Sequence, residues 1–217
     1  MSHHDKMVLR HPLPIRFWHW WNAAAMFALG LSGFYIHAPL TFRLFSTMDA
    51  ARTVHFVAMW MLAWGIVYRV WYAIWTKDYR NVLFKLSDLK DFGSLTLYYL
   101  FIRNTHPDYG KYNPGQKLMY TSIPICAVIM GITGFTMYWP TTFSWLAYAL
   151  GGPLVVRLIH YCFTWVFVLM FMVHFYLDLA EGLPVLWAMI TGKIPKDFHA
   201  EVKVPREPKA PKAEAEA

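Results

Sequence analysis

Four long apolar stretches constrain this chain more than any other feature of its sequence. They run over about residues 17–37, 53–75, 118–139 and 156–177. Each is close to the roughly 20 residues that an α-helix needs to cross a bilayer, and tryptophan and tyrosine gather at their ends as in interfacial belts. Hydrophobic residues make up 57% of the chain and charged residues only 15%. The sequence therefore predicts an all-α fold, an integral membrane four-helix bundle.

The distribution of lysine and arginine predicts the orientation of these helices. Three lie before the first stretch, seven in the 76–117 connection and six after residue 178, whereas the two short connections carry few. Positively charged loops tend to stay on the cytoplasmic side, so we expect both termini and the 76–117 connection to be cytoplasmic. This topology accounts for the net charge of +7, and no nucleic-acid partner is expected.

The polar segments suggest a simple domain organisation. Residues 1–195 are expected to form one transmembrane domain, and residues 196–217, rich in Ala, Pro, Glu and Lys, a polar cytoplasmic tail. Residues 82–103 mix apolar and charged positions. This mixture predicts a helix that lies along the inner membrane interface, within the cytoplasmic loop.

Two histidines stand inside the last apolar stretch, LIHYCFTWVFVLMFMVHFYL at 158–177. Ionisable residues are costly within a membrane and usually functional. His160 and His174 are fourteen positions apart, so on a helix their side chains point within about 40° of one another and lie ~21 Å apart along the axis. Both side chains are therefore expected on one helix face, near opposite membrane surfaces.

Two histidines on other stretches lie at matching depths. His19 is expected near the inner surface, as is His174, and His55 near the outer surface, as is His160. Haem iron takes an axial imidazole from each side, and a helix bundle supplies facing helices. We therefore predict two b-type haems, about 20 Å apart, with His19 and His174 as ligands of the inner haem and His55 and His160 of the outer one.

Other interpretations of these histidines stay open. A single histidine in such a helix can hydrogen-bond a neighbouring carbonyl, and chains of histidines serve proton relays, although no acidic residue accompanies these at the expected membrane depth. A catalytic metal site is disfavoured because no carboxylate or thiolate cluster is present. His37, at the outer rim, is either an interfacial residue or an alternative to His55 as an outer ligand.

An arginine precedes three of the predicted ligands by three residues. These are Arg16, Arg52 and Arg157. One helical turn separates each from its histidine, so each could reach a haem propionate with a bidentate contact. Interfacial anchoring explains the same positions equally well.

Four motifs support a family resemblance over about residues 10–195. They are R-x-x-H-W at 16–20, R-x-x-H at 52–55, K-Y-N-P-G-Q-K at 111–117 and the histidine spacing of 160–174. In these the chain resembles the gamma subunit, a dihaem cytochrome b, of membrane-bound respiratory formate dehydrogenase. The paired histidines are shared with the cytochrome b subunits of nickel–iron hydrogenases, whereas K-Y-N-x-G-Q-K favours the formate dehydrogenase branch.

The resemblance implies partners, a substrate and a location. A periplasmic iron–sulfur subunit, joined to a catalytic molybdopterin or tungstopterin subunit, would pass electrons to the outer haem. The inner haem would reduce menaquinone, or another quinone, near the cytoplasmic side of a bacterial inner membrane, and the complex could form a higher oligomer. The positions that match the quinone site are Asn113, Gly115, Gln116 and His174. Asn-Pro-Gly is also an ordinary turn leading into a helix.

The chain is not expected to contain catalytic residues for substrate chemistry. Its two cysteines, Cys126 and Cys162, are too few for an iron–sulfur cluster. The prediction is therefore an electron-transfer subunit of an oxidoreductase complex in a respiratory chain. Three alternatives stay open: the cytochrome b of a nickel–iron hydrogenase, the cytochrome b of a sulfur-compound reductase in which electrons leave quinol outward, and a haem-free membrane anchor.

Overall fold

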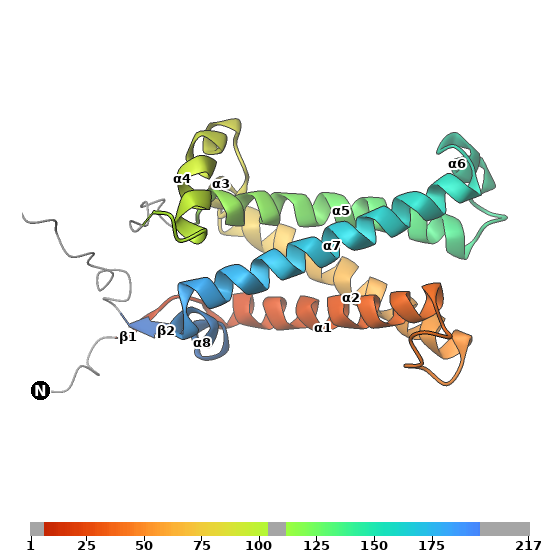
Figure 1. Ribbon diagram of the computed structural model, residues 1–217, viewed down its shortest axis with the longest axis horizontal. Helices are drawn as coiled ribbons and strands as arrows, with labels where there is room; N and C mark the ends of the chain where they lie inside the picture. The colour runs from red at the N-terminus through yellow and green to blue at the C-terminus, as the bar shows by residue number, and fades with distance from the viewer. Residues whose placement is uncertain (1–6, 104–111, 196–217) are drawn as a thin grey trace, which may run out of the picture.

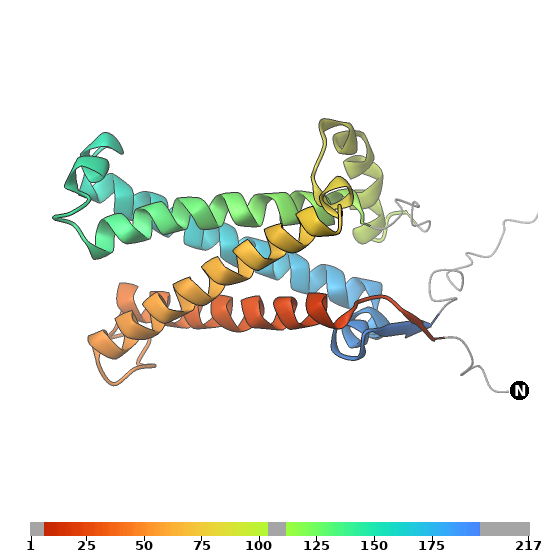
Figure 2. The same cartoon turned by 180° about the vertical axis from the view of Figure 1, so that it is seen from behind.

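Four long helices dominate the computed structural model, which describes residues 7–103 and 112–195. They are α1 (Leu13–His37), α2 (Met48–Trp75), α5 (Pro114–Tyr138) and α7 (Pro153–Glu181). Helices α1 and α5 run roughly parallel to one another but apart, and α2 and α7 cross obliquely between them on opposite sides (Figures 1 and 2). The backbones pack most extensively within two pairs, α1 with α2 and α5 with α7.

Three of the four helices are long and apolar enough to cross a membrane. The mean hydropathy of the best window is 1.4 in α2, 1.7 in α5 and 1.9 in α7. Helix α1 has 25 residues but does not reach this apolarity, because Arg16, His19 and Asn22 lie in its first half. Large apolar side chains such as Phe27, Trp64 and Leu169 are exposed, as is expected of a surface that faces lipid. The predicted helical membrane class is confirmed, while the count of four spanning helices stays a prediction.

The last long helix is longer than the sequence suggests. It continues to Glu181, four residues beyond the predicted end at 177, and ends where Gly182 adopts a φ of 99°, a conformation that favours glycine. Asp178 and Glu181 therefore belong to the same helix as His174. These two carboxylates follow directly after the stretch in which no acidic residue was expected, and the longer helix places them in the turns next to His174.

A small sheet closes one end of the bundle and was not predicted. Strand β1 (Met7–Leu9) pairs antiparallel with β2 (Lys193–Pro195), and helix α8 (Leu183–Thr191) precedes β2. The Arg16 guanidinium donates to the Ile190 carbonyl of α8, so α1 is tied to the end of the described chain. The fold is thus helical apart from one two-stranded sheet within the described residues. The predicted tail, 196–217, lies outside them, and the 1–195 boundary stays a prediction.

The predicted helix within 82–103 is present in a shorter form. The connection contains α3 (Tyr79–Val82), the 3₁₀-helix η1 (Leu86–Asp88) and α4 (Leu89–Tyr99). These elements lie at the same end of the bundle as β1, β2 and α8, whereas α6 (Ser144–Ala149) lies at the opposite end (Figure 1). That α4 lies on the membrane interface stays a prediction.

Close packing of α1 on α2 depends on Gly65. Trp18 Nε1 donates to the Gly65 carbonyl at 2.7 Å, and Asn22, whose amide donates to the Trp18 carbonyl, covers the same glycine. A Cβ on residue 65 would collide with the Asn22 side chain. A polar side chain between two membrane helices needs such hydrogen bonds because lipid offers none. This contact fixes α1 beside α2, and with it the height of His19.

Candidate functional site

The structure brings the four predicted histidines together in two pairs, at opposite ends of α7. His19 of α1 faces His174, with ring centres 6.1 Å apart. His55 of α2 faces His160, with ring centres 6.4 Å apart. The pairing is the one expected from depth alone.

These separations fit one metal ion between the two rings of each pair. An imidazole nitrogen lies about 2.0–2.1 Å from the metal it binds, and the ring centre lies about 1.1 Å further away. Two imidazoles on opposite sides of one iron therefore have centres roughly 6.2 Å apart. A direct hydrogen bond or stacking contact does not require this spacing in both pairs.

In the pair formed by His55 and His160, called the outer pair after its predicted position, hydrogen bonds indicate which tautomer each imidazole adopts. The Thr133 hydroxyl of α5 donates to the Ile129 carbonyl at 2.8 Å and lies 2.8 Å from His160 Nδ1. A hydroxyl has one proton to donate, so Thr133 accepts from Nδ1–H. The Nε2 lone pair of His160 is then available to a metal, the arrangement usual for histidine ligands.

The second outer histidine has an equivalent hydroxyl on a different helix. The Ser32 hydroxyl of α1 donates to the Ala28 carbonyl and lies 3.0 Å from His55 Nδ1. By the same argument it accepts from Nδ1–H and leaves Nε2 free. Both outer imidazoles are therefore prepared for axial ligation by neighbouring helices. Neither hydroxyl is apparent from the sequence, because each contact joins residues far apart in the chain.

Glycines leave space beside the outer pair. A Cβ on Gly33 of α1 would lie 3.4 Å from His55 Cε1, and a Cβ on Gly134 of α5 would lie 3.5 Å from His160 Cε1. One turn earlier on each helix, a Cβ on Gly30 or Gly131 would have no neighbour within 4 Å. Two glycine-bearing faces beside paired imidazoles suit a flat macrocycle better than a bare ion.

The inner pair has a more polar and more open setting. The buried Nδ1 of His19 has no hydrogen-bond partner within the part of the chain that the structure describes. His174 Nε2 lies 3.4 Å from the Asp178 carboxylate, and the His174 side chain is 36% exposed. The unpartnered nitrogen and the exposed ring are consistent with a ligand that is held by both imidazoles and reaches water.

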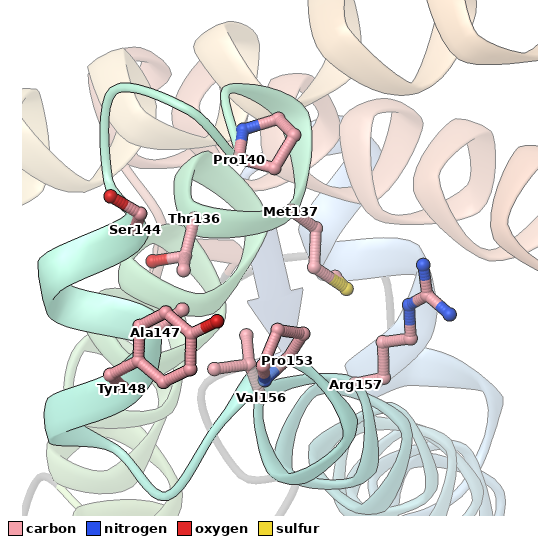
Figure 3. A pocket seen from close by; sticks show the side chains of 9 residues that line it. All are labelled: Thr136, Met137, Pro140, Ser144, Ala147, Tyr148, Pro153, Val156 and Arg157. Atoms are coloured by element: carbon pink, nitrogen blue, oxygen red, sulfur yellow. The ribbon is translucent and has the colours of Figure 1, made fainter.

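The remaining charged and imidazole candidates have other neighbours. His37 stacks on Tyr161, with ring centres 4.8 Å apart, which favours the interfacial interpretation. Arg16 binds the Ile190 carbonyl, and Arg52 lies 3.9 Å from Asp49 in an exposed pair. Arg157 lines a small pocket between α5, α6 and α7, across from Ser144 and Tyr148 (Figure 3). A propionate contact stays a prediction for all three arginines.

Three of the four predicted quinone residues, Asn113, Gly115 and Gln116, lie at the start of α5. Asn113 Oδ1 accepts from the Gln116 backbone N–H at 2.8 Å, and Gln116 Oε1 accepts from the Asn113 N–H at 3.1 Å. This reciprocal capping box satisfies two N–H groups of the helix terminus, with Gly115 in the turn between. Both amide oxygens are therefore occupied, and a quinone contact stays a prediction.

A polar cluster that was not predicted joins this turn to α7. Tyr99 of α4 donates to the Glu181 carboxylate at 2.6 Å and accepts from the Asn113 amide at 3.3 Å. Tyr176 donates to the Tyr99 carbonyl at 2.6 Å. Nothing in the local sequence around Tyr99 indicates this arrangement, because its three partners come from α5 and α7.

A membrane helix bundle that holds two facing pairs of imidazoles at iron-sized separations, one pair with a hydroxyl beside each Nδ1, has the architecture of a b-type cytochrome. The chain belongs to the family described as prokaryotic cytochrome b561, which it matches over residues 10–192. Membership implies a b-type haem and makes the chain an integral membrane protein that serves electron transport.

Individual relatives sharpen the comparison. The chain is 31% identical to a probable Ni/Fe-hydrogenase B-type cytochrome subunit of Azotobacter vinelandii, over 86% of each chain. It is 28% identical to a protein of the same description from Cupriavidus necator, again over 86% of each. It also shares 25% identity with a putative protein-methionine-sulfoxide reductase subunit, YedZ1, of Azospira oryzae, over 70% of this chain and 80% of that protein.

These relatives correct the branch expected from the sequence. The resemblance to the wider cytochrome b family is confirmed, but the formate dehydrogenase gamma subunit is not supported, and relatives named for hydrogenase stand in its place. The K-Y-N-P-G-Q-K motif misled because its Asn-Pro-Gly-Gln part is a helix cap, which any helix in this position could use. The hydrogenase alternative is therefore favoured over the formate dehydrogenase prediction.

Proposed function

We propose that this chain is the dihaem cytochrome b subunit of a membrane-bound nickel–iron hydrogenase. In this role it carries electrons from the catalytic subunits, through a four-helix bundle, to a quinone. The proposal rests on one observation: two pairs of imidazoles face one another, with ring centres 6.1 Å and 6.4 Å apart. One histidine of each pair stands toward either end of the same apolar helix, α7. The relatives named for Ni/Fe-hydrogenase support the choice of partner.

Each pair of histidines would hold one haem. His55 and His160 would hold the outer group, with Ser32 and Thr133 keeping their Nδ1 protons in place, and His19 and His174 the inner one. When bound, the two haems supply one-electron carriers near each membrane surface. The apolar helices around them keep water from the path between the surfaces.

The protein's own groups at the inner end suit a quinone substrate. The Gln116 NH₂ has no hydrogen bond within the described residues, so it could donate to a quinone carbonyl. The Asn113 amide is directed to Tyr99 instead. We therefore assign the direct contact to Gln116, and to Asn113 the role of fixing the turn. Menaquinone is the proposed quinone.

The proposed orientation keeps both termini in the cytoplasm. Elements β1, α3, α4, α8 and β2 share one end of the bundle (Figure 1). The basic residues of α3, α4 and their flanking segments lie at that end, which favours the inner side. The opposite end, with the outer pair and α6, would then face the periplasm of a bacterial cell. An iron–sulfur subunit that delivers electrons would dock there.

A second candidate follows from the Azospira oryzae relative. That protein is described as a subunit of a putative protein-methionine-sulfoxide reductase. An equivalent partner here would reverse the flow, so that electrons leave quinol and pass outward. The lower identity and coverage favour the hydrogenase role.

Optical spectroscopy of the mildly solubilised native complex tests the proposal. We expect bands of b-type haem to appear on addition of hydrogen, to reach the dithionite-reduced intensity and to be absent with formate alone. Replacement His160→Ala should remove about half of the haem, because each pair holds one group.

Three results would contradict parts of this assignment. Bands that appear only with dithionite would remove hydrogenase as the partner and favour the outward reductase. Bands that appear with formate would restore the formate dehydrogenase branch. The absence of any haem band would leave only a haem-free anchor.

A further inference from the structure

Three proton-carrying side chains form a stripe at the inner end of α7. His174, Asp178 and Glu181 stand at positions i, i+4 and i+7, which lie on one face of a helix. The first two are in contact, with 3.4 Å between His174 Nε2 and Asp178 Oδ2. The stripe leads from the predicted inner ligand to the end of the helix.

Glu181, the last residue of this stripe, is held in place by α4. Tyr99 of α4 donates to its carboxylate at 2.6 Å, and Tyr176 fixes the Tyr99 backbone by donating to its carbonyl. Tyr99 itself is only 7% exposed. Burial, and then its bond to Glu181, raise the pKa of Tyr99 above its ordinary value. The hydroxyl therefore keeps its proton and remains a donor to the carboxylate over the physiological pH range.

Glu181 is accessible to water and is linked by hydrogen bonds to the turn at Asn113, which belongs to the predicted quinone site. Glu181 is half-buried and stands at the last position of α7, at the end of the bundle that carries the loops (Figure 1). Through Tyr99 it is joined to Asn113, which caps the helix that presents Gln116. Besides Tyr99, the titratable groups Tyr98 of α4 and Asp178 of α7 interact electrostatically with this carboxylate.

We infer that Glu181, positioned by Tyr99, delivers protons to a quinone that is reduced beside His174. The inference rests on the proposed function. A quinone becomes a quinol by taking up two electrons, one at a time from the haems, and two protons. Each proton leaves the Glu181 carboxyl group, and the carboxylate takes the next one from water on the same side. Tyr99 is a positioning residue: it orients the carboxylate and ties it to the Asn113 turn.

Stopped-flow spectroscopy of the haem-loaded complex separates proton delivery from electron transfer. Haems reduced with dithionite are mixed with menadione, which needs protons, or with ferricyanide, which takes only electrons. We expect Glu181→Gln to slow reoxidation by menadione roughly 100-fold, the size of a general-acid effect. Reoxidation by ferricyanide and the haem spectrum should stay unchanged, because Gln keeps the oxygen that accepts from Tyr99. Tyr99→Phe should slow the menadione reaction less.

Controls make each outcome decisive. Asp91→Asn removes an exposed carboxylate from α4 at the same end and should leave both reactions unchanged, whereas Glu181→Asp should restore part of the menadione rate. Redox-difference infrared spectra should lose a carboxylic C=O band in Glu181→Gln. Equal menadione rates in wild type and Glu181→Gln would overturn the inference. Wild-type haems that no quinone reoxidises would instead overturn the quinone-reducing role.

Discussion

The hydroxyl of Thr133 decides the proton position on His160. It donates its own proton to the Ile129 carbonyl, so it can only accept from the imidazole. Ser32 does the same for His55. Hydrogen bonds of this kind raise the basicity of a metal ligand and orient its ring. A single hydroxyl on a neighbouring helix thus leaves Nε2 of each of these two histidines free for the proposed haem.

Loss of this hydroxyl should change the outer haem without removing it. In Thr133→Val the imidazole loses an acceptor for Nδ1–H, donates less electron density to iron and stabilises the oxidised state less. We expect the midpoint potential of that haem to rise by on the order of 40 mV, which corresponds to about 1 kcal/mol for one hydrogen bond. Redox titration followed by haem absorbance measures it. Thr133→Ser, which keeps the hydroxyl, should match wild type; an unshifted potential in Thr133→Val would contradict the role.

At the scale of elements, short polar contacts attach the 76–117 connection to the long helices. Asp88 of η1 accepts from the Lys85 backbone N–H at 2.8 Å and from Lys117 of α5 at 2.9 Å. Arg69 of α2 pairs with Asp78 at 3.1 Å, just before α3. These bonds hold α4 beside the start of α5 and the end of α7, where Tyr99 meets Glu181.

The Asp88 attachment should weaken in acid. The bonds from the Lys85 backbone and then from Lys117 hold the pKa of Asp88 below its ordinary value of 3.8. Its contribution to stability is therefore complete above about pH 5 and is lost as the pH falls below about 4, through the folded-state pKa. Thermal melts of wild type and Asp88→Asn in detergent should differ by a constant Tm between about pH 5 and 7, and converge below about pH 4. A difference independent of pH would contradict this role of the carboxylate.

At the scale of the whole molecule, aromatic and imidazole rings make many of the contacts between the two helix pairs, both from α7 and between α2 and α5, where Trp60 meets Phe135. The extensive backbone packing lies within α1–α2 and within α5–α7. Between the two pairs, His174 and His160 of α7 face His19 and His55. The ring centres of Phe171 of α7 and Phe27 of α1 lie 5.4 Å apart. Groups bound between the paired imidazoles would therefore act as cross-links between the two halves.

Removal of haem should accordingly destabilise the entire bundle. A ligand that binds only the folded state adds about 4 kcal/mol at 1,000 times its Kd, and such a change shifts Tm by several degrees in a domain of this size. We expect the haem-depleted protein to melt several degrees below the loaded one, and His160→Ala to lie between them. Thermal melts followed by tryptophan fluorescence check this order. Identical melting of the loaded and depleted forms would exclude a cross-linking role.

Hydropathy and residue spacing depend on the sequence alone. They were enough to predict the helical membrane class, the pairing of the four histidines and the position of the two pairs toward opposite ends of the bundle. A segment in lipid must satisfy its backbone hydrogen bonds internally, which a helix does, and a helix repeats every 3.6 residues. The length of the apolar stretches and the helical period were therefore enough for these predictions. Only the tertiary structure shows the contacts between distant segments. These are the bonds of the Ser32 and Thr133 hydroxyls to histidines, the contact between Tyr99 and Glu181, and the sheet formed by β1 and β2. Those contacts join segments far apart in sequence, and their geometry depends on how the helices cross. The turn at Asn113 combines both kinds of information. Its sequence, Asn-Pro-Gly, predicts a turn, but only the tertiary structure shows that the Asn113 amide donates to Tyr99.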